Sequence, residues 1–365
     1  MHRENRIHHE TQKGRGAPSN DISRRFNLQD REVDGDWLDE RERIDEAAVK
    51  LRTEVTIEFP KSIINYNTSP DLPFDRSINA YRGCEHGCVY CYARPTHAYH
   101  DLSPGLDFES KLFAKPNAAD LLRQTFAKPN YQPASIAIGT NTDPYQPIEG
   151  RYRITREILE VMLEVMHPVV ITTKSNRVVD DIDVLAQLAE LQLTAVAISV
   201  TSLDSTTARL LEPRAPTPAR RLEAVRQLSE AGIHVHVNIA PVVPGITDHE
   251  IESIVAEATD HGARSVSMIP MRLPHEVAPL FEQWLETHYR DRKAKVMSIV
   301  RQMRGGKRND PAFHSRMRGQ GPWADLIRTR LAIASRKAGL GKAKVALRTD
   351  LFKRPLITGS QLELF

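Results

Sequence analysis

The sequence is poor in cysteine. It contains three in 365 residues, Cys84, Cys88 and Cys91, and all of them lie within one stretch of eight residues. Cysteines so few and so close together exclude a framework of disulfide bonds, and in a reducing compartment they indicate a bound metal. No fourth cysteine exists to complete a site with four thiolates.

Long apolar runs and an apolar leader are also absent. No stretch approaches the roughly 20 apolar residues of a membrane helix, and the opening residues MHRENRIHHE contain no hydrophobic segment of the secretory type. We therefore predict a cytoplasmic protein without a membrane partner. Hydrophobic residues make up 40% and charged residues 27% of the chain, which is typical of a folded globular protein.

Three regions differ in composition. Residues 1–58 are polar and poor in aromatic residues, which predicts a disordered N-terminal arm with one possible helix at residues 36–51. Residues 59–290 form the predicted core domain, and residues 291–365 a basic helical C-terminal extension. From residue 290 to residue 354, nineteen Lys and Arg face four Asp, although the whole chain carries a net charge of only +3. Such a region suits a nucleic acid, and a solvated helical surface is the alternative.

From residue 77 onward, short apolar runs alternate with amphipathic segments. The predicted strands are 77–81, 135–139, 169–173, 195–200, 235–240 and 265–269, and the predicted helices are 155–166, 181–191, 218–231, 248–261 and 275–289. This alternation predicts parallel β/α units with right-handed crossovers. An open doubly wound sheet and a partial barrel both satisfy it, and in both the ligand site lies at the carboxyl ends of the strands.

Polar residues follow the predicted strands at that rim. They are Gly139, Asn141, Asp143, Lys174, Ser199 and Asn238. A lysine at the carboxyl end of a strand points toward the ligand face, which favours a binding role for Lys174. Asp143, Ser202 and Asp204 have the alternative role of turn or N-cap residues, and we favour that alternative for Asp204.

The thiol spacing, Cys-x3-Cys-x2-Cys, admits two kinds of metal site. Thiolates are soft ligands, so zinc and iron–sulfur are the candidates. A structural zinc needs a fourth ligand, which His86, His97 or His100 offers nearby. An iron–sulfur cluster on three thiolates keeps one iron open for a small molecule, in contrast to the four thiolates of ferredoxin-type clusters.

Further motifs make the chain resemble a known family. The run Cys84-x3-Cys88-x-Tyr90-Cys91 resembles the signature of radical S-adenosylmethionine (SAM) enzymes, and the β/α series over residues 77–290 is similar to their partial (β/α)6 TIM-like barrel. Within that family the chain resembles the spore photoproduct lyase-like branch. The segments that carry this likeness are Tyr90-Cys91-Tyr92, 142–147 (TDPYQP), 173–175 (TKS) and 212–216 (EPRAP).

The resemblance implies the cofactors and the first chemical step. The three cysteines would hold a 4Fe-4S cluster whose open iron binds SAM. One electron from a reductant such as flavodoxin or ferredoxin would cleave SAM to methionine and a 5′-deoxyadenosyl radical, which abstracts hydrogen from the substrate. The implied cofactor contacts are Tyr90 beside the cluster or adenine, the loop with Gly139, Asn141 and Asp143 at the methionine amino group, Lys174 at the SAM carboxylate, and Ser199 and Asn238 at the ribose.

Arg214 has two predicted roles. It pairs with Glu212 or Asp204 and fixes its loop, or it holds the SAM carboxylate or an anionic substrate group, which is the role we favour. Glu149 and Arg151 stay undecided between similar roles.

One departure concerns the hydrogen donor. The spore photoproduct lyase family relies on an additional cysteine beside the end of the second strand, where this chain reads Gly-Thr-Asn-Thr. A thiol donor is therefore impossible here. Tyr92, Tyr99 and Tyr145 are weak candidates for a relay, because a tyrosine usually packs with its hydroxyl bonded.

The predicted function is therefore a radical SAM iron–sulfur enzyme of lyase-like or transferase type. Nucleic acid is the favoured substrate, for repair of a DNA photolesion or for base modification. A protein or small metabolite is the second hypothesis, and a non-catalytic nucleic-acid-binding protein with a Cys3His zinc site is the third. In the basic extension, Trp323 with Arg316 and Arg318 suits stacking on a base, although a buried structural role is favoured for Trp323 itself.

Overall fold

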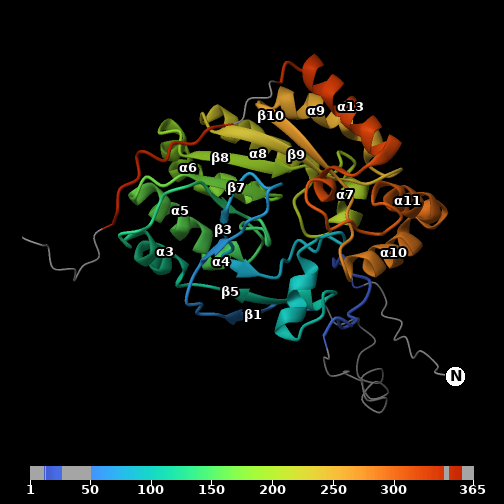
Figure 1. Ribbon diagram of the computed structural model, residues 1–365, viewed down its shortest axis with the longest axis horizontal. Coiled ribbons are helices and arrows are strands. Elements are labelled where there is room, and N and C mark those ends of the chain that lie inside the picture. Colours follow the sequence, from blue (N-terminus) through green and yellow to red (C-terminus); the bar gives the residue numbers. More distant parts are fainter. Residues whose placement is uncertain (1–11, 13, 27–50, 341–344, 356–365) are drawn as a thin grey trace, which may run out of the picture.

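The computed structural model describes residues 12, 14–26, 51–340 and 345–355. Its centre is a seven-stranded sheet in the order β10-β9-β8-β7-β6-β3-β2 (Figure 1). The strands are β2 Ile64–Tyr66, β3 Arg76–Ile78, β6 Ile136–Ile138, β7 Val169–Thr173, β8 Thr194–Ser199, β9 His234–Val242 and β10 Ser265–Pro270. From β3 to β10 all neighbouring strands are parallel, and β2 is antiparallel to β3.

The order of these strands identifies the fold. The six parallel strands follow one another across the sheet in chain order, with no point at which the order reverses. A doubly wound sheet requires such a reversal. The fold is therefore the predicted partial (β/α)6 TIM-like barrel, and all six predicted strands are present.

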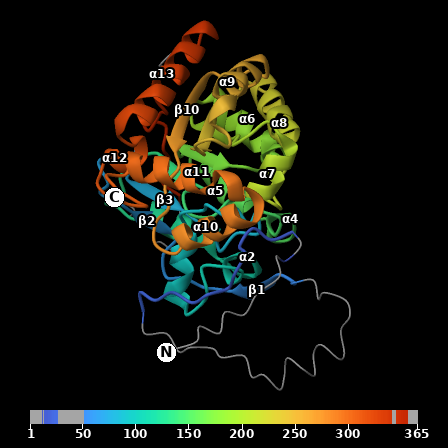
Figure 2. The same cartoon turned by 90° about the vertical axis from the view of Figure 1, so that its right-hand side faces the viewer.

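Helices cover one face of the large sheet (Figures 1 and 2). Val235 and Val237 of β9 are fully buried in the same cluster as residues of α8 and α9, while His236 and Asn238 alternate with them and face the other side. That other face is the inner surface of the barrel. The helices of the outer layer are α3 Ala118–Phe126, α5 Ile154–Glu164, α6 Ile182–Glu190, α8 Pro218–Glu230 and α9 Ile251–Asp260.

A second sheet has the order β1-β5-β4, from β1 Glu54–Ile57, β5 Lys111–Ala114 and β4 Tyr81–Arg82. The predicted strand 77–81 is divided, because β3 belongs to the large sheet and β4 to the small one. Asn79 lies between them. Its side-chain oxygen accepts the N–H of Asn141 (3.0 Å), and its backbone oxygen accepts from the ammonium of Lys115 (3.0 Å).

The prediction of a disordered arm does not hold for residues 14–26 and 51–58. β1 pairs in parallel with β5, and the buried carboxylate of Glu109 accepts the N–H groups of Gly16 (3.0 Å) and Ala17 (2.8 Å). Composition did not reveal this contact, because the segment is anchored through its backbone. The possible helix at residues 36–51 lies outside the described residues apart from Leu51, which is not helical.

The C-terminal extension packs against the barrel and against the cysteine loop. Val296 and Met303 share a buried cluster with Cys88 and Tyr90, and Ile327 belongs to the main core. α13 contacts α9 and β10 and runs along that side of the molecule in Figure 2. The helices here are α10 Val277–His288, α11 Arg290–Met303, α12 Ser315–Arg318 and α13 Gly321–Lys337. No helix within the described ranges has the length and apolar character needed to cross a membrane.

Candidate metal centre

The cysteine loop, residues 83–94, is held from inside by Arg94. This side chain is fully buried and donates to the carbonyl oxygens of Cys88 (2.9 Å), Gly87 (3.1 Å) and two residues of the turn at 104–105 (3.1 and 2.9 Å). It also forms a salt bridge with the buried Glu109. Because all five donors of the guanidinium find partners, its removal from water is compensated and the loop has a fixed interior.

Two glycines allow the loop to pass close to its neighbours. Gly83 has φ 72°, and a Cβ there would lie 2.6 Å from a methyl carbon of Leu112. Gly87 has φ 68°, and a Cβ there would lie 2.7 Å from a carboxylate oxygen of Glu109. Any other residue would be strained in this backbone region and would also clash.

The TDPYQP segment braces the loop from the neighbouring strand. Gln146 is fully buried, accepts the N–H of Glu85 (2.9 Å) and donates to the carbonyl oxygen of Gly83 (3.1 Å). Tyr145 is also buried, and its hydroxyl donates to Asp181 (3.0 Å). The motif therefore acts through hydrogen bonds that hold the loop against β6 and β7.

The three thiols lie on one short loop. Cys84 and Cys88 are buried and Cys91 is half-buried. Within the described part of the chain, no three His, Cys, Asp or Glu side chains converge to hold one metal ion. A structural zinc takes four ligands, whereas an iron–sulfur cluster is held by cysteine thiolates.

The histidines proposed for zinc are engaged elsewhere. His86 faces Asp143, with 3.3 Å between Nδ1 and the carboxylate. Nε2 of His97 lies 2.8 Å from the carbonyl oxygen of Lys111, and burial lowers the pKa of His97 to about 4. His100 packs on the ring of Phe113, with 5.1 Å between ring centroids.

Burial controls the protonation of the thiols. It raises the pKa of Cys84 well above its usual value, and Asp143 and the two other cysteines add to this effect. Burial also raises the pKa of Cys88 to about 12, although Lys174 opposes the rise. Without a metal, Cys84 and Cys88 therefore stay neutral at physiological pH. Metal binding deprotonates such groups outright.

Tyr90 is tied to a buried ion pair. Its hydroxyl donates to Glu212, which also accepts from Thr201 (2.7 Å) and forms a salt bridge with Arg221. Arg221 in turn donates to the carbonyl oxygen of Ser199 (3.1 Å), at the end of β8. Burial would raise the pKa of Glu212, but Arg221 and Lys174 outweigh burial and lower it. The EPRAP segment thus fixes the aromatic residue of the cysteine motif.

Asp143 and Lys174 lie at the ends of neighbouring strands. Asp143 accepts from the Thr173 hydroxyl (2.6 Å), the Lys174 N–H (2.7 Å) and the Tyr145 N–H (2.9 Å). His86 and these bonds outweigh burial and lower the pKa of Asp143 to about 2. Its predicted alternative role in a turn therefore has direct structural support.

The Lys174 ammonium lies 5.9 Å from the centroid of the Tyr90 ring. Burial would lower the pKa of Lys174, but Cys88 in its thiolate form, Glu212 and Asp143 outweigh burial and raise it. A charged lysine thus stands beside the thiols, at the position that favours an anionic ligand.

Ser199 and Asn238 lie side by side, since β8 and β9 pair at these two residues. The Ser267 hydroxyl donates to the side-chain oxygen of Asn238 (2.8 Å), and His236 lies 2.8 Å from Ser267. Because Ser267 occupies that oxygen, the amide N–H groups of Asn238 remain as donors. The structure brings these polar residues together on the inner face of the barrel.

Four other predicted residues have supporting positions. A Cβ on Gly139 would lie 2.0 Å from the carbonyl oxygen of Thr172, so glycine is required where β6 meets β7. Asn141 is held through its backbone N–H by Asn79. Arg214 pairs with Glu85 (3.1 Å), so its predicted pairing with Glu212 or Asp204 is wrong. Asp204 is the N-cap of α7 Ser205–Leu211, as favoured.

The tyrosines proposed as relays are separated. Tyr145 is buried against Asp181, and Tyr99 is 68% exposed and packs on Phe26. Tyr92 is the one on the rim, where its hydroxyl donates to the carbonyl oxygen of Thr140 and the guanidinium carbon of Arg272 lies 5.6 Å from its ring centroid.

Sequence patterns missed the residues that hold the site together, namely Arg94, Glu109, Gln146, Arg221 and Ser267. None stands in a spacing that marks a ligand, and their contacts form only when the chain folds. Gln146 lies inside the TDPYQP segment, so that motif could have pointed to its role.

Fold and site together define a partial β/α barrel with three cysteines on one loop at the carboxyl ends of its strands. A family model described as the radical SAM superfamily matches residues 78–258. The chain is 34% identical over 232 residues to an uncharacterized protein of Mycobacterium tuberculosis, covering 63% of this chain and 68% of that protein. The chain belongs to the radical SAM superfamily, whose enzymes use a 4Fe-4S cluster and SAM.

Two further likenesses are more distant. An uncharacterized protein of Methanocaldococcus jannaschii is 28% identical over 180 residues, covering 49% of this chain and 64% of that protein. The structure of a spore photoproduct lyase complexed with dinucleoside spore photoproduct is 15% identical, with a TM-score of 0.48, covering 63% of this chain and 66% of that chain. A structural match this loose carries no argument about the substrate.

Proposed function

We propose that Cys84, Cys88 and Cys91 hold the cluster, and that the enzyme acts on a nucleic acid by hydrogen abstraction. The observation that supports the ligand assignment is the fixed loop itself. Three thiols lie on it, beside a charged lysine and at the carboxyl ends of parallel strands. When bound, the cluster and SAM supply the one-electron chemistry of the superfamily.

The residues of the rim have separate proposed tasks. Lys174 would meet the SAM carboxylate in a charge-assisted hydrogen bond. Ser199 and the amide of Asn238 would bind the ribose hydroxyls, and Tyr90 would pack beside the cofactor with its hydroxyl held by Glu212. Arg214 is better placed to support the cysteine loop through Glu85 than to bind SAM.

Nucleic acid is the proposed substrate class for two reasons. The motif likeness to the spore photoproduct lyase-like branch favours it, and so does the excess of cations between residues 290 and 354. Because this chain has no cysteine to donate the final hydrogen atom, the last step of the reaction must differ from that of the spore photoproduct lyase family. The proposal therefore includes both base modification and repair. The cytoplasm remains the predicted location.

Anaerobic reconstitution with iron and sulfide, followed by reduction and incubation with SAM, tests the ligand set. We expect slow release of 5′-deoxyadenosine, detected by chromatography, and its loss in each of the variants Cys84→Ala, Cys88→Ala and Cys91→Ala. Release from Cys88→Ala at the wild-type rate would contradict the assignment.

Lys174→Ala provides the matched control. It should weaken SAM binding while its iron and sulfide content stays at the wild-type level, because the lysine is proposed to touch SAM and not the metal. Unchanged SAM affinity in this variant would contradict the assignment of Lys174 as a SAM contact.

A further inference from the structure

A groove of about 1070 Å³ lies beside β10. We call it the β10 groove. Its walls are β10, the segment 313–320 and α13, and they include Ser267, Phe313, Arg318, Arg328, Leu331 and Arg336. Among the described strands β10 pairs with β9 alone, so its other edge is open toward the groove.

The groove is positively charged. Among the described residues that line it there is no Asp or Glu, whereas three arginines and one histidine are present. Arg318 and Arg336 are exposed, and neither has a carboxylate within salt-bridge distance in the described part of the chain. Arg328 is paired with Asp325. Cations without a nearby acid attract an anionic ligand.

The groove also presents an aromatic face. Phe313 is 52% exposed, and the guanidinium carbon of Arg316 lies 4.9 Å from its ring centroid. Arg316 is itself fixed by Asp71 (2.6 Å), so the aromatic and cationic pair is anchored to the loop before β3. An accessible aromatic ring among arginines is the arrangement on which unpaired bases stack.

One residue of the groove, Ser267, contacts a residue of the candidate site. Ser267 lines the groove, and its hydroxyl donates to Asn238 (2.8 Å), the residue proposed at the SAM ribose. A chain molecule lying in the groove would therefore pass one hydrogen bond away from the cofactor contact.

We propose that the β10 groove binds a single-stranded segment of nucleic acid, with phosphates at Arg318 and Arg336 and a base on Phe313. This inference rests on the proposed nucleic-acid function and adds the form and the location of the substrate. A duplex keeps its bases stacked, so it cannot offer a free base face to Phe313.

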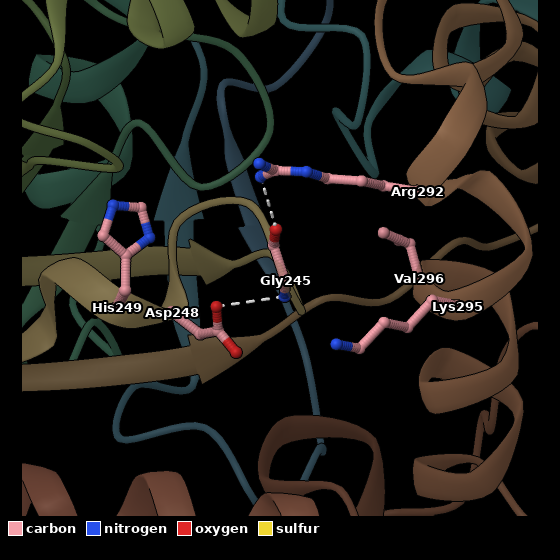
Figure 3. A pocket seen from close by; sticks show the side chains of 6 residues that line it. All are labelled: Gly245, Asp248, His249, Arg292, Lys295 and Val296. Carbon is pink, nitrogen blue, oxygen red and sulfur yellow. Dashed lines mark hydrogen bonds between the residues drawn. The ribbon is translucent and has the colours of Figure 1, made fainter.

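A second pocket, of about 450 Å³, supplies a matched control (Figure 3). It presents two exposed cations, Arg292 and Lys295, from the same extension, and Arg292 donates to the carbonyl oxygen of Gly245 (3.0 Å). Unlike the β10 groove, it contains a carboxylate, Asp248, and its described lining has no Phe, Tyr or Trp ring. Removing these two charges changes the net charge as much as removing Arg318 and Arg336.

The test measures binding of a fluorescent oligothymidylate of about 15 nucleotides to the full-length holoenzyme by anisotropy, between about 50 and 200 mM salt. Arg318→Ala with Arg336→Ala should reduce the slope of log affinity against log salt by about 1.4, since each single-strand phosphate contact contributes about 0.7. Phe313→Ala should weaken binding about tenfold. Arg292→Ala with Lys295→Ala should leave the slope unchanged.

The outcomes separate the two proposals. All variants should unfold as cooperatively as wild type. In the absence of substrate, they should release 5′-deoxyadenosine at the wild-type rate. Three results would overturn the groove proposal. The two double variants could reduce the salt slope equally, or the protein could bind duplex as tightly as single strand. Polyglutamate could also displace the probe as well as unlabelled oligothymidylate does. Wild-type protein that cleaves SAM but binds no oligonucleotide would also overturn it, with the radical SAM chemistry intact. Binding without SAM cleavage would instead overturn the proposed function.

Discussion

The two sides of the barrel use arginine in opposite ways. Around the cysteine loop, Arg94 and Arg221 are buried, and each is paired with a buried carboxylate, Glu109 or Glu212. Along the β10 groove, Arg318 and Arg336 are exposed and no described carboxylate lines the wall. A buried cation with all its partners fixes a geometry, whereas an exposed and unpaired one remains free for a ligand.

The largest expected effect comes from breaking the interior pair. Arg94→Ala leaves Glu109 buried without its cation and frees four carbonyl oxygens of the loop and the following turn. Loss of one partner of a buried pair costs about 3–5 kcal/mol. We expect a markedly lower melting temperature and iron content well below that of wild type after reconstitution.

Arg226→Ala is the control for this variant. Arg226 also contacts two acids, Glu223 and Glu230, but on the exposed surface of α8. Its loss should change neither the melting temperature nor the iron content measurably. Equal effects of the two substitutions would contradict the distinction between the two uses of arginine.

Glu149 is a buried carboxylate that forms no salt bridge with any described residue. It accepts from the Tyr81 hydroxyl and from the N–H groups of Thr155 (3.0 Å) and Arg156 (3.3 Å). Burial nevertheless raises the pKa of Glu149 to about 7. Because this is above the unfolded value, the stability it contributes is complete below about pH 4.5 and is lost as pH rises through about 7.

Glu149→Gln should therefore become more stable relative to wild type as pH rises. The difference between pH about 5 and 8 should approach 3 kcal/mol, from about 1.4 kcal/mol for each unit of pKa difference. Urea unfolding at several pH values measures it. If the free energy of unfolding of the two proteins changes with pH in parallel, burial does not raise the pKa of Glu149.

The smallest expected effect is on the groove side. Asp71→Asn weakens the link to Arg316 (2.6 Å) and to the N–H of His314 (3.0 Å). Arg316 lowers the pKa of Asp71 to about 2. The stability it contributes is thus present above about pH 3.8 and lost as pH falls through about 2.

At neutral pH this substitution should cost about 1 kcal/mol. Limited proteolysis should cut faster within residues 305–320, while iron content and SAM cleavage stay at wild-type levels. Slower SAM cleavage in Asp71→Asn would show that the β10 groove and the cysteine loop are coupled. The contrast between their arginines does not predict such coupling.

The fold was predictable because its signals are local. The runs at 169–173 and 235–240 are apolar and bounded by helical patterns. The first becomes β7 with the same bounds, and the second becomes β9, which begins one residue earlier and ends two residues later. The cysteine triplet is equally local. Arg94 and Arg221 were not predictable, since a single arginine carries no pattern and its partners depend on tertiary folding. Arg214 shows the same limit, because its partner Glu85 is distant in sequence.

The N-terminal segment has a practical consequence for anyone who shortens this chain. The compositional boundary at residue 59 suggests a cut that would keep the whole barrel. Such a cut would remove β1 and expose the edge of β5, and it would also take the Gly16 and Ala17 N–H donors from Glu109. The carboxylate that holds Arg94 would then be short of partners. A shortened protein should retain its barrel but load iron poorly, so tags and truncations belong before residue 14.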